Sequence, residues 1–246
     1  MDIVFANPDD LRTQTYWELY GPLHLIWLAG IAIACFLACF GFRRASTEKQ
    51  NKILKILSLW ILFQELLKNF LYWRVDAFSY GLLPFHICGI SIIFCLWYAF
   101  KPGKLNGAYI YGVCLPGAMA ALIFSDWTDL PWYNFSALNS FTIHGELVIF
   151  AMLALTSGLL KPDFKQIPKM TLVMYAIAIP IYYLNKVWDT NFMFINYPSP
   201  GSPLVPLYDI FGNGYVIAAA LLLVVIWVIL FLPWKLLGKP SKEESA

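Results

Sequence analysis

Apolar residues occur along the chain in long runs separated by short polar segments. The hydrocarbon core of a bilayer needs about 20 mostly apolar residues per helix. The pattern therefore predicts an all-α polytopic membrane protein, folded as a single membrane domain. Its seven transmembrane helices are expected over residues 20–42, 53–73, 84–100, 107–124, 141–160, 170–187 and 214–234. The outer segment 188–213 is rich in Pro, Gly and Asn and is predicted to form an ordered lid over the bundle.

The composition places these helices in lipid. The chain has 246 residues, of which 60% are hydrophobic and 13% charged, whereas a soluble domain carries about 25% charged residues. A net charge of +2 gives no strong basic field, so nucleic-acid binding is excluded as a function class. The five cysteines all lie in apolar runs, which predicts reduced thiols and not a disulfide scaffold.

The basic residues predict the orientation of the helices. Most of the 17 Lys and Arg residues lie between the first and second, third and fourth, and fifth and sixth spans, or after the seventh. The opposite loops hold few, namely Arg12, Arg74 and Lys186. Because basic residues are retained on the cytoplasmic side, we expect the amino terminus outside and the carboxy terminus in the cytoplasm.

A weak internal similarity relates the first three spans to the last three. The first and fifth spans open with an aromatic residue followed by His24 and His144, and the third and seventh are preceded by Leu83-Pro84 and Val205-Pro206. This order predicts a parallel 3+1+3 repeat, as in some transporters. Coincidence among residues typical of helix starts is the alternative.

Polar and ionisable side chains gather in the outer halves of the predicted spans. Such groups cost several kcal/mol inside a membrane unless they are partnered, so each is a candidate functional residue. The pattern predicts an outward-facing polar chamber, with candidate catalytic residues Cys88, His86, His144 and Glu146, and candidate substrate-binding residues His24, Glu65, Lys68, Asn69, Asn185, Asn191 and Asn213. Structural roles are the alternatives: an ion pair for Glu65 with Lys68, a backbone hydrogen bond for His24, and apolar packing for Cys88.

Cys88 suggests one chemistry for this chamber. It lies in the first turns of its helix, where the helix dipole favours a thiolate. With His86 or His144 as base and Glu65 or Glu146 as orienting carboxylate, it would transfer or hydrolyse an acyl group through a thioester. Lys68 and Asn69 would then hold a lipid headgroup.

Metal chemistry and transport are the other interpretations. Zinc held by His24, His86 and His144 is the weaker one, because the chain has no HxxxH or HExxH motif on a single helix, and no cofactor is expected. A transporter or substrate-binding membrane protein would use the chamber as a vestibule. It would need breaks in the inner halves of the spans, for which Pro116 and Pro180 are the candidates.

Several motifs resemble those of the YwaF-type bacterial membrane proteins. They are His24 in the first span, ELLKN at 65–69, LPFHICGI at 83–90, IHGE at 143–146 and NFMFI at 191–195. The resemblance covers essentially the whole chain. That family is similar to a human seven-span acyltransferase that loads acyl chains onto ether phospholipids through a reactive cysteine. The resemblance implies a seven-helix protein of the bacterial plasma membrane, with a membrane lipid as partner and Cys88 as the candidate nucleophile. It says nothing of oligomeric state.

Overall fold

The computed structural model describes residues 3–7, 11, 15–199 and 201–237. All regular structure within them is helical, which confirms the predicted all-α class. The long helices are α2 (Pro22–Phe42), α3 (Thr47–Arg74), α4 (Ile87–Phe100), α7 (Phe135–Thr156), α8 (Ile167–Trp188) and α10 (Tyr215–Leu237). Shorter ones are α5 (Lys104–Tyr109), α6 (Leu115–Ile123) and α9 (Val205–Phe211). Single turns are η1 (Ile3–Phe5), η2 (Tyr80–Leu82), η4 (Trp127–Asp129), η5 (Phe164–Gln166), η6 (Phe192–Phe194) and η7 (Gly212–Gly214).

Within the described residues, six helical segments are long and apolar enough to cross a membrane. They are Pro22–Phe42, Tyr80–Phe100, Lys104–Ile123, Phe135–Thr156, Phe164–Trp188 and Tyr215–Leu236. They agree with six of the seven predicted spans and support a multi-pass membrane protein.

Helix α3 covers the remaining predicted span but is less apolar. It begins with a charged turn, and Glu65 and Lys68 interrupt its outer half. Its 28 residues would nevertheless extend for about 42 Å, and it packs against α4 and α7. Crossing of the membrane by α3, and with it the seven-span topology, stays a prediction.

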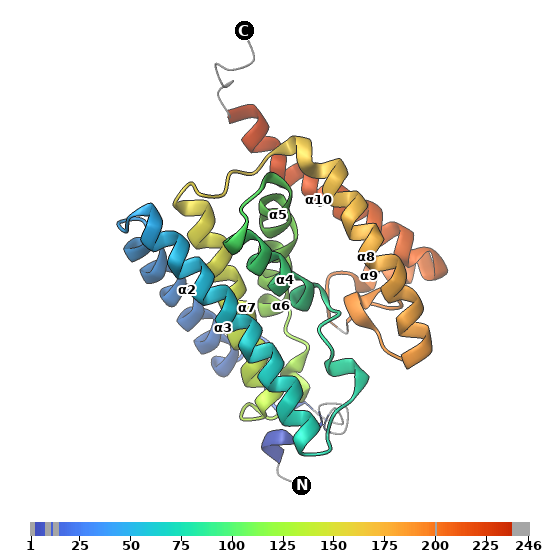
Figure 1. Ribbon diagram of the computed structural model, residues 1–246. Coiled ribbons are helices and arrows are strands. Elements are labelled where there is room, and N and C mark those ends of the chain that lie inside the picture. The colour runs from blue at the N-terminus through green and yellow to red at the C-terminus, as the bar shows by residue number, and fades with distance from the viewer. Residues whose placement is uncertain (1–2, 8–10, 12–14, 200, 238–246) are drawn as a thin grey trace.

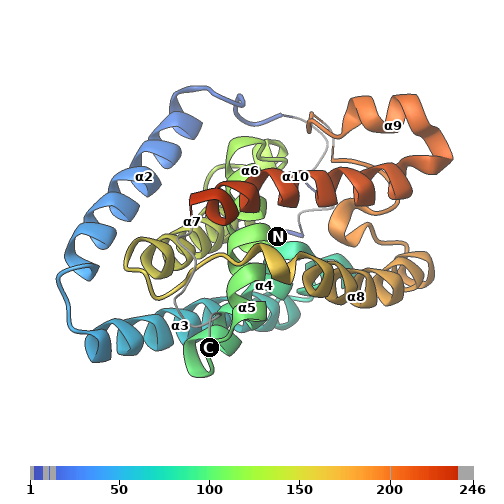
Figure 2. The same cartoon turned by 90° about the horizontal axis from the view of Figure 1, so that it is seen from above.

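The helices form a central column flanked by two groups. Figure 1 shows α4, α5 and α6 in the middle, with α2, α3 and α7 on one side and α8, α9 and α10 on the other. Viewed from above, α2 and α7 again lie to one side of the column and α8 and α9 to the other, while α10 crosses over it in this view (Figure 2). Helix α7 packs against α2, α3 and α6. The first helix of the predicted second repeat unit therefore lies with the first unit, and the repeat stays a prediction.

The fourth span contains a π-helix, η3 (Ile110–Cys114), between α5 and α6. A Cβ atom on Gly112 would lie 2.8 Å from the Phe231 ring and 3.1 Å from the end of Met170. Trp227 donates a hydrogen bond to the Gly112 carbonyl at 2.8 Å. The glycine therefore allows side chains of α8 and α10 to approach the central column at its widened turn.

Candidate functional site

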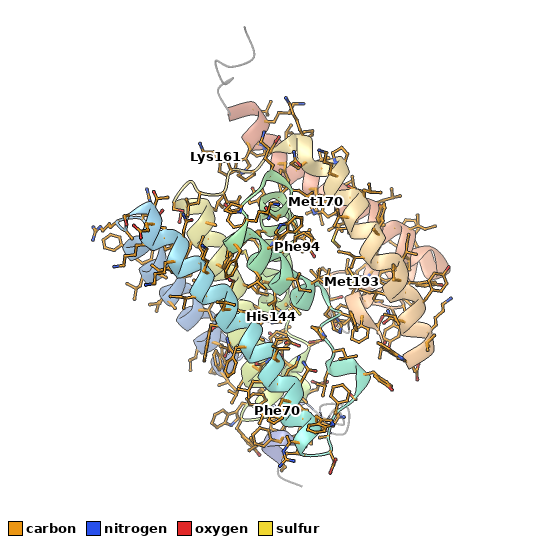
Figure 3. The ribbon with its side chains drawn as sticks, in the orientation of Figure 1. Phe70, Phe94, His144, Lys161, Met170 and Met193 are labelled. Atoms are coloured by element: carbon orange, nitrogen blue, oxygen red, sulfur yellow. The ribbon has the colours of Figure 1, made fainter. Side chains whose placement is uncertain are left out.

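Cys88 and His144 meet at the middle of the bundle. Cys88 is the second residue of α4, and its thiol interacts with the ring of His144 on α7. Figure 3 shows His144 in the central part of the molecule, near the start of α4. His144, one of the two candidate bases that the sequence left open, thus interacts with the thiol.

A hydrogen bond to the backbone determines the tautomer of the His144 ring. Nδ1 lies 2.7 Å from the Ser140 carbonyl oxygen, one turn earlier on α7. A carbonyl only accepts, so in the neutral ring Nδ1 carries the proton and Nε2 keeps its lone pair. Trp127 stacks on the ring at 5.4 Å between centroids. His144 is therefore held in the orientation and tautomer that a base for the Cys88 thiol requires.

The start of α4 is built so that Cys88 falls in its first turn. His86 is the N-cap residue and forms no side-chain cap. The backbone N–H groups of the first turn of a helix have no partner within it. A Cβ atom on Gly89 would lie only 2.3 Å from the Pro84 carbonyl oxygen, so glycine is needed for the chain to fold back here. These amides and the helix dipole surround the thiol with partial positive charge.

Asp126 adds a carboxylate beside the pair and was missed by sequence reasoning. It directly precedes η4 and interacts electrostatically with His144. Its Oδ2 atom also accepts a hydrogen bond from Ser199 at 3.1 Å. The available signal was its position, because Asp126 is the first acidic residue after the fourth predicted span.

The His86 side chain contacts residues 192–194 of the outer segment. The backbone N–H of Met193 donates to its Nδ1 at 3.2 Å, and its ring contacts Phe192 and Phe194. The Nδ1 lone pair is thus occupied, so in the neutral ring Nε2 carries the proton. Met193 and Phe194 both adopt left-handed backbone conformations, with φ of 59° and 53°, which non-glycine residues rarely adopt.

Two residues of the segment 189–204 bond to neighbours of the Cys88–His144 pair. Met193 bonds to His86, two residues before Cys88, and Ser199 bonds to Asp126, which interacts with His144. The predicted lid also contains structure of its own, in η6 and α9. Figure 3 shows Met193 between the start of α4 and the second group of helices.

His24 is fully buried, and both of its ring nitrogens have partners. Its Nδ1 accepts from the Tyr20 N–H at 3.0 Å, and its Nε2 donates to the Leu122 carbonyl at 2.7 Å. The Ser125 hydroxyl lies 3.3 Å from the same nitrogen. These bonds tie the start of α2 to the end of α6 and occupy both ring nitrogens.

Glu146 points away from His144, as their spacing of two residues requires. Trp60 donates to its Oε1 at 2.9 Å, and Gln64 donates to its Oε2. Both partners lie on α3, so the carboxylate joins α3 to α7. The structure does not place Glu146 where it could orient His144.

Glu65, Lys68 and Asn69 form a local cluster on α3. Lys68 makes an ion pair with Glu65 at 2.7 Å, and the Asn69 amide donates to the same carboxylate oxygen at 3.1 Å. The side chains of Glu65 and Lys68 are mostly buried. The structural alternative given by the sequence, an ion pair, is thus the arrangement present.

The candidate asparagines hold the outer segment together. The Asn185 side chain bonds to both backbone groups of Phe192 and to the Thr190 hydroxyl. Asn191 bonds to the Tyr197 carbonyl and the Asn196 N–H. The side chain of Asn213 lies outside the described part of the structure.

The three histidines of the predicted chamber have different hydrogen-bond partners, and the single chamber stays a prediction. His24, His86 and His144 each bond to different segments. Among the described residues, no three His, Cys, Asp or Glu side chains are grouped as metal ligands. What the structure brings together is a thiol, an imidazole without a proton on Nε2 in its neutral form, a carboxylate, and two residues of the outer segment.

Comparison with known proteins gives a family. The sequence model of the TMEM164 family matches residues 19–231. Neither the curated proteins nor the solved structures contain a match to the chain.

Proposed function

The chain belongs to the TMEM164 family of membrane proteins, and on that premise we propose that it is a lipid-directed acyltransferase or hydrolase. Cys88 is the nucleophile and His144 the base. The observation that carries the proposal is the interaction between these two side chains, with the His144 ring oriented by its Nδ1 bond to the Ser140 carbonyl. A nucleophile within hydrogen-bonding reach of an oriented base is the arrangement that covalent acyl transfer needs.

The proposed reaction has two half-reactions. His144 Nε2 takes the thiol proton while Cys88 Sγ attacks the carbonyl carbon of a lipid ester. The C–O bond then breaks, and the proton goes to the departing alkoxide oxygen, leaving an acyl thioester on Cys88. In the second half, His144 takes the proton of an acceptor hydroxyl or of water. The acceptor oxygen bonds to the acyl carbon, the C–S bond breaks, and the proton returns to sulfur.

Two further features support this chemistry. The unpaired amides in the first turn of α4 are suited to stabilising the oxyanion of each tetrahedral intermediate. Asp126 is suited to stabilising the imidazolium that forms when His144 takes a proton, because it interacts electrostatically with that ring. A lid held over the pair by Met193 and Ser199 would limit the access of water.

The test is to trap the thioester. Purified protein incubated with a short-chain p-nitrophenyl ester should gain one acyl group, found on Cys88 by peptide mass spectrometry and removed by neutral hydroxylamine. Cys88→Ser should abolish that adduct, and His144→Asn should slow its formation by about 100-fold or more. Cys95→Ser is the matched control, because Cys95 lies on the same helix and is also a free thiol. An adduct that persists in Cys88→Ser would contradict the mechanism.

A second candidate function, transport, has one observation in its favour. The fourth span is interrupted at its centre by η3, and Pro180 lies inside α8. Both features are typical of helices that bend. A transporter would keep its substrate flux in Cys88→Ser, whereas the acyltransferase would lose turnover, so the same variant separates the two.

A further inference from the structure

A long apolar groove runs along α2, on a part of the molecule that the proposed reaction does not use. Its volume is about 850 Å³, and its walls come from α2, α6 and α7. Toward the outer end it is lined by Leu28 and Leu122, and toward the other end by Phe40 and Thr156. The walls of the groove consist mainly of aliphatic and aromatic side chains, so the groove suits a hydrocarbon chain.

The groove ends at two arginines. Arg43 and Arg44 follow directly after α2 and line the groove beside Phe40. The Arg44 guanidinium lies 3.7 Å from the centroid of the Phe40 ring, which holds it against the groove wall. Within the described residues, neither arginine has a carboxylate within ion-pairing distance. Two cations without a counter-charge among the described residues therefore lie at one end of the apolar groove.

The arginine end of the groove is remote from Cys88 and His144. His144, Val148, Met152 and Thr156 form one stripe along α7, because they are spaced four residues apart. Thr156, at the arginine end, is three turns beyond His144, or about 18 Å along the helix axis. The esters of a glycerophospholipid lie within a few bonds of its phosphate. A lipid whose phosphate rests on the arginines cannot present its ester to Cys88, so this would be a second lipid site.

We propose that the groove binds an anionic phospholipid, with its phosphate on Arg43 and Arg44 and an acyl chain between α2 and the α6–α7 wall. Guanidinium groups bind phosphate through paired hydrogen bonds. The arginines also lie at the basic end of the bundle, which the positive-inside rule assigns to the cytoplasm. That leaflet carries the anionic lipids, and basic pockets between helices on that side bind anionic headgroups. Charge complementarity thus selects the occupant.

Native mass spectrometry of the full chain tests the headgroup. Dioleoyl-phosphatidylglycerol and dioleoyl-phosphatidylcholine share the same chains, so only the headgroup differs. We expect wild type to retain phosphatidylglycerol at least about tenfold more strongly, and the double variant Arg43→Gln/Arg44→Gln to lose that preference. Lys49→Gln/Lys52→Gln is the matched control, because it removes two nearby exposed charges that do not line the groove. Equal retention of both lipids by wild type, or loss of preference in the lysine control, would overturn the proposal.

A second pair of variants tests the apolar part. Ala32 and Ala34 are both exposed on α2, but only Ala32 lines this groove. Ala34 lines a separate groove that α2 forms with α7 alone. Ala32→Trp should fill the groove and reduce retained phosphatidylglycerol at least about fivefold, while Ala34→Trp should leave retention unchanged. A larger loss of retained lipid in Ala34→Trp than in Ala32→Trp would place the lipid outside this groove. The readout is lipid retention, so the result does not depend on whether the protein transfers acyl groups.

Discussion

The ring of His144 interacts with the Cys88 thiol, and its Nδ1 bonds to the Ser140 carbonyl oxygen. The bond to Ser140 sets the tautomer of the neutral ring and leaves the Nε2 lone pair available to the thiol. No other histidine of the chain is in that position, since the ring of His24 is occupied at both nitrogens and that of His86 bonds to Met193. The relationship makes the reactivity of Cys88 the first quantity to measure.

Cys88 should be the most reactive of the five thiols. An iodoacetamide probe soluble in detergent should label it first, because the other cysteines have no imidazole beside them in the described structure. His144→Asn should slow that labelling by about tenfold or more. His24→Asn is the control for losing a histidine elsewhere in the bundle. Equal labelling rates in His144→Asn and wild type would contradict the role of His144 as base.

Gly89→Ala should disrupt the start of α4. The new Cβ atom would lie 2.3 Å from the backbone oxygen of Pro84, which is rigid and cannot move aside. We expect a loss of about 1–3 kcal/mol in the free energy of unfolding, measured by urea denaturation in detergent micelles. Gly30→Ala is the control, because nothing lies within 4 Å of its Cβ position. Equal stability of the two variants would show that the turn at Pro84 is adaptable.

Removal of one partner of the α3 ion pair should cost more than removal of both. Glu65→Leu leaves Lys68 mostly buried without a counter-charge and should destabilise the fold by about 3 kcal/mol. Adding Lys68→Leu should recover most of that loss, measured by the same denaturation. Lys104→Gln, which removes an exposed charge, should have little effect. If the losses of the two single variants simply added in the double variant, the stability contributions of the two side chains would be independent of each other.

Ser199→Ala should loosen the lid. It removes the hydrogen bond to Asp126, so the segment 189–204 should open more often over the Cys88–His144 pair. A net loss of about 1 kcal/mol corresponds to about fivefold faster labelling of Cys88. Ser202→Ala lies in the same segment and serves as control. Unchanged labelling in Ser199→Ala would show that access to Cys88 does not pass this contact.

Reporter fusions should establish whether α3 crosses the membrane. Fusions after Asn51, Lys104 and Lys165 should report the cytoplasm, because the basic residues lie on that side. Fusions near Asp76 and Ser199 should report the outside. Asn51 lies in the second turn of α3 and Asp76 lies just after its end. The same location for both would therefore mean that α3 does not span and that the chain has six crossings.

The candidate site was only partly predictable from the sequence. Cys88 was singled out because it lies at a helix start, and His144 because it is an ionisable group in an apolar run. Asp126 was passed over because it lies in a loop, where an acidic residue is unremarkable. The sequence also offers Glu146 as an orienting group, but its carboxylate bonds to Trp60 and Gln64 of α3, on the face of α7 opposite His144.

The sequence by itself determined that this chain is a helical membrane protein. Backbone groups in lipid must be satisfied within the chain, and long apolar runs meet that requirement locally as helices. Only the tertiary structure decided that Cys88 meets His144, that His24 and Asn185 bind backbone groups, and that Arg43 and Arg44 end an apolar groove. Helix formation depends on neighbours within a few residues, whereas these contacts depend on how side chains of distant helices pack together.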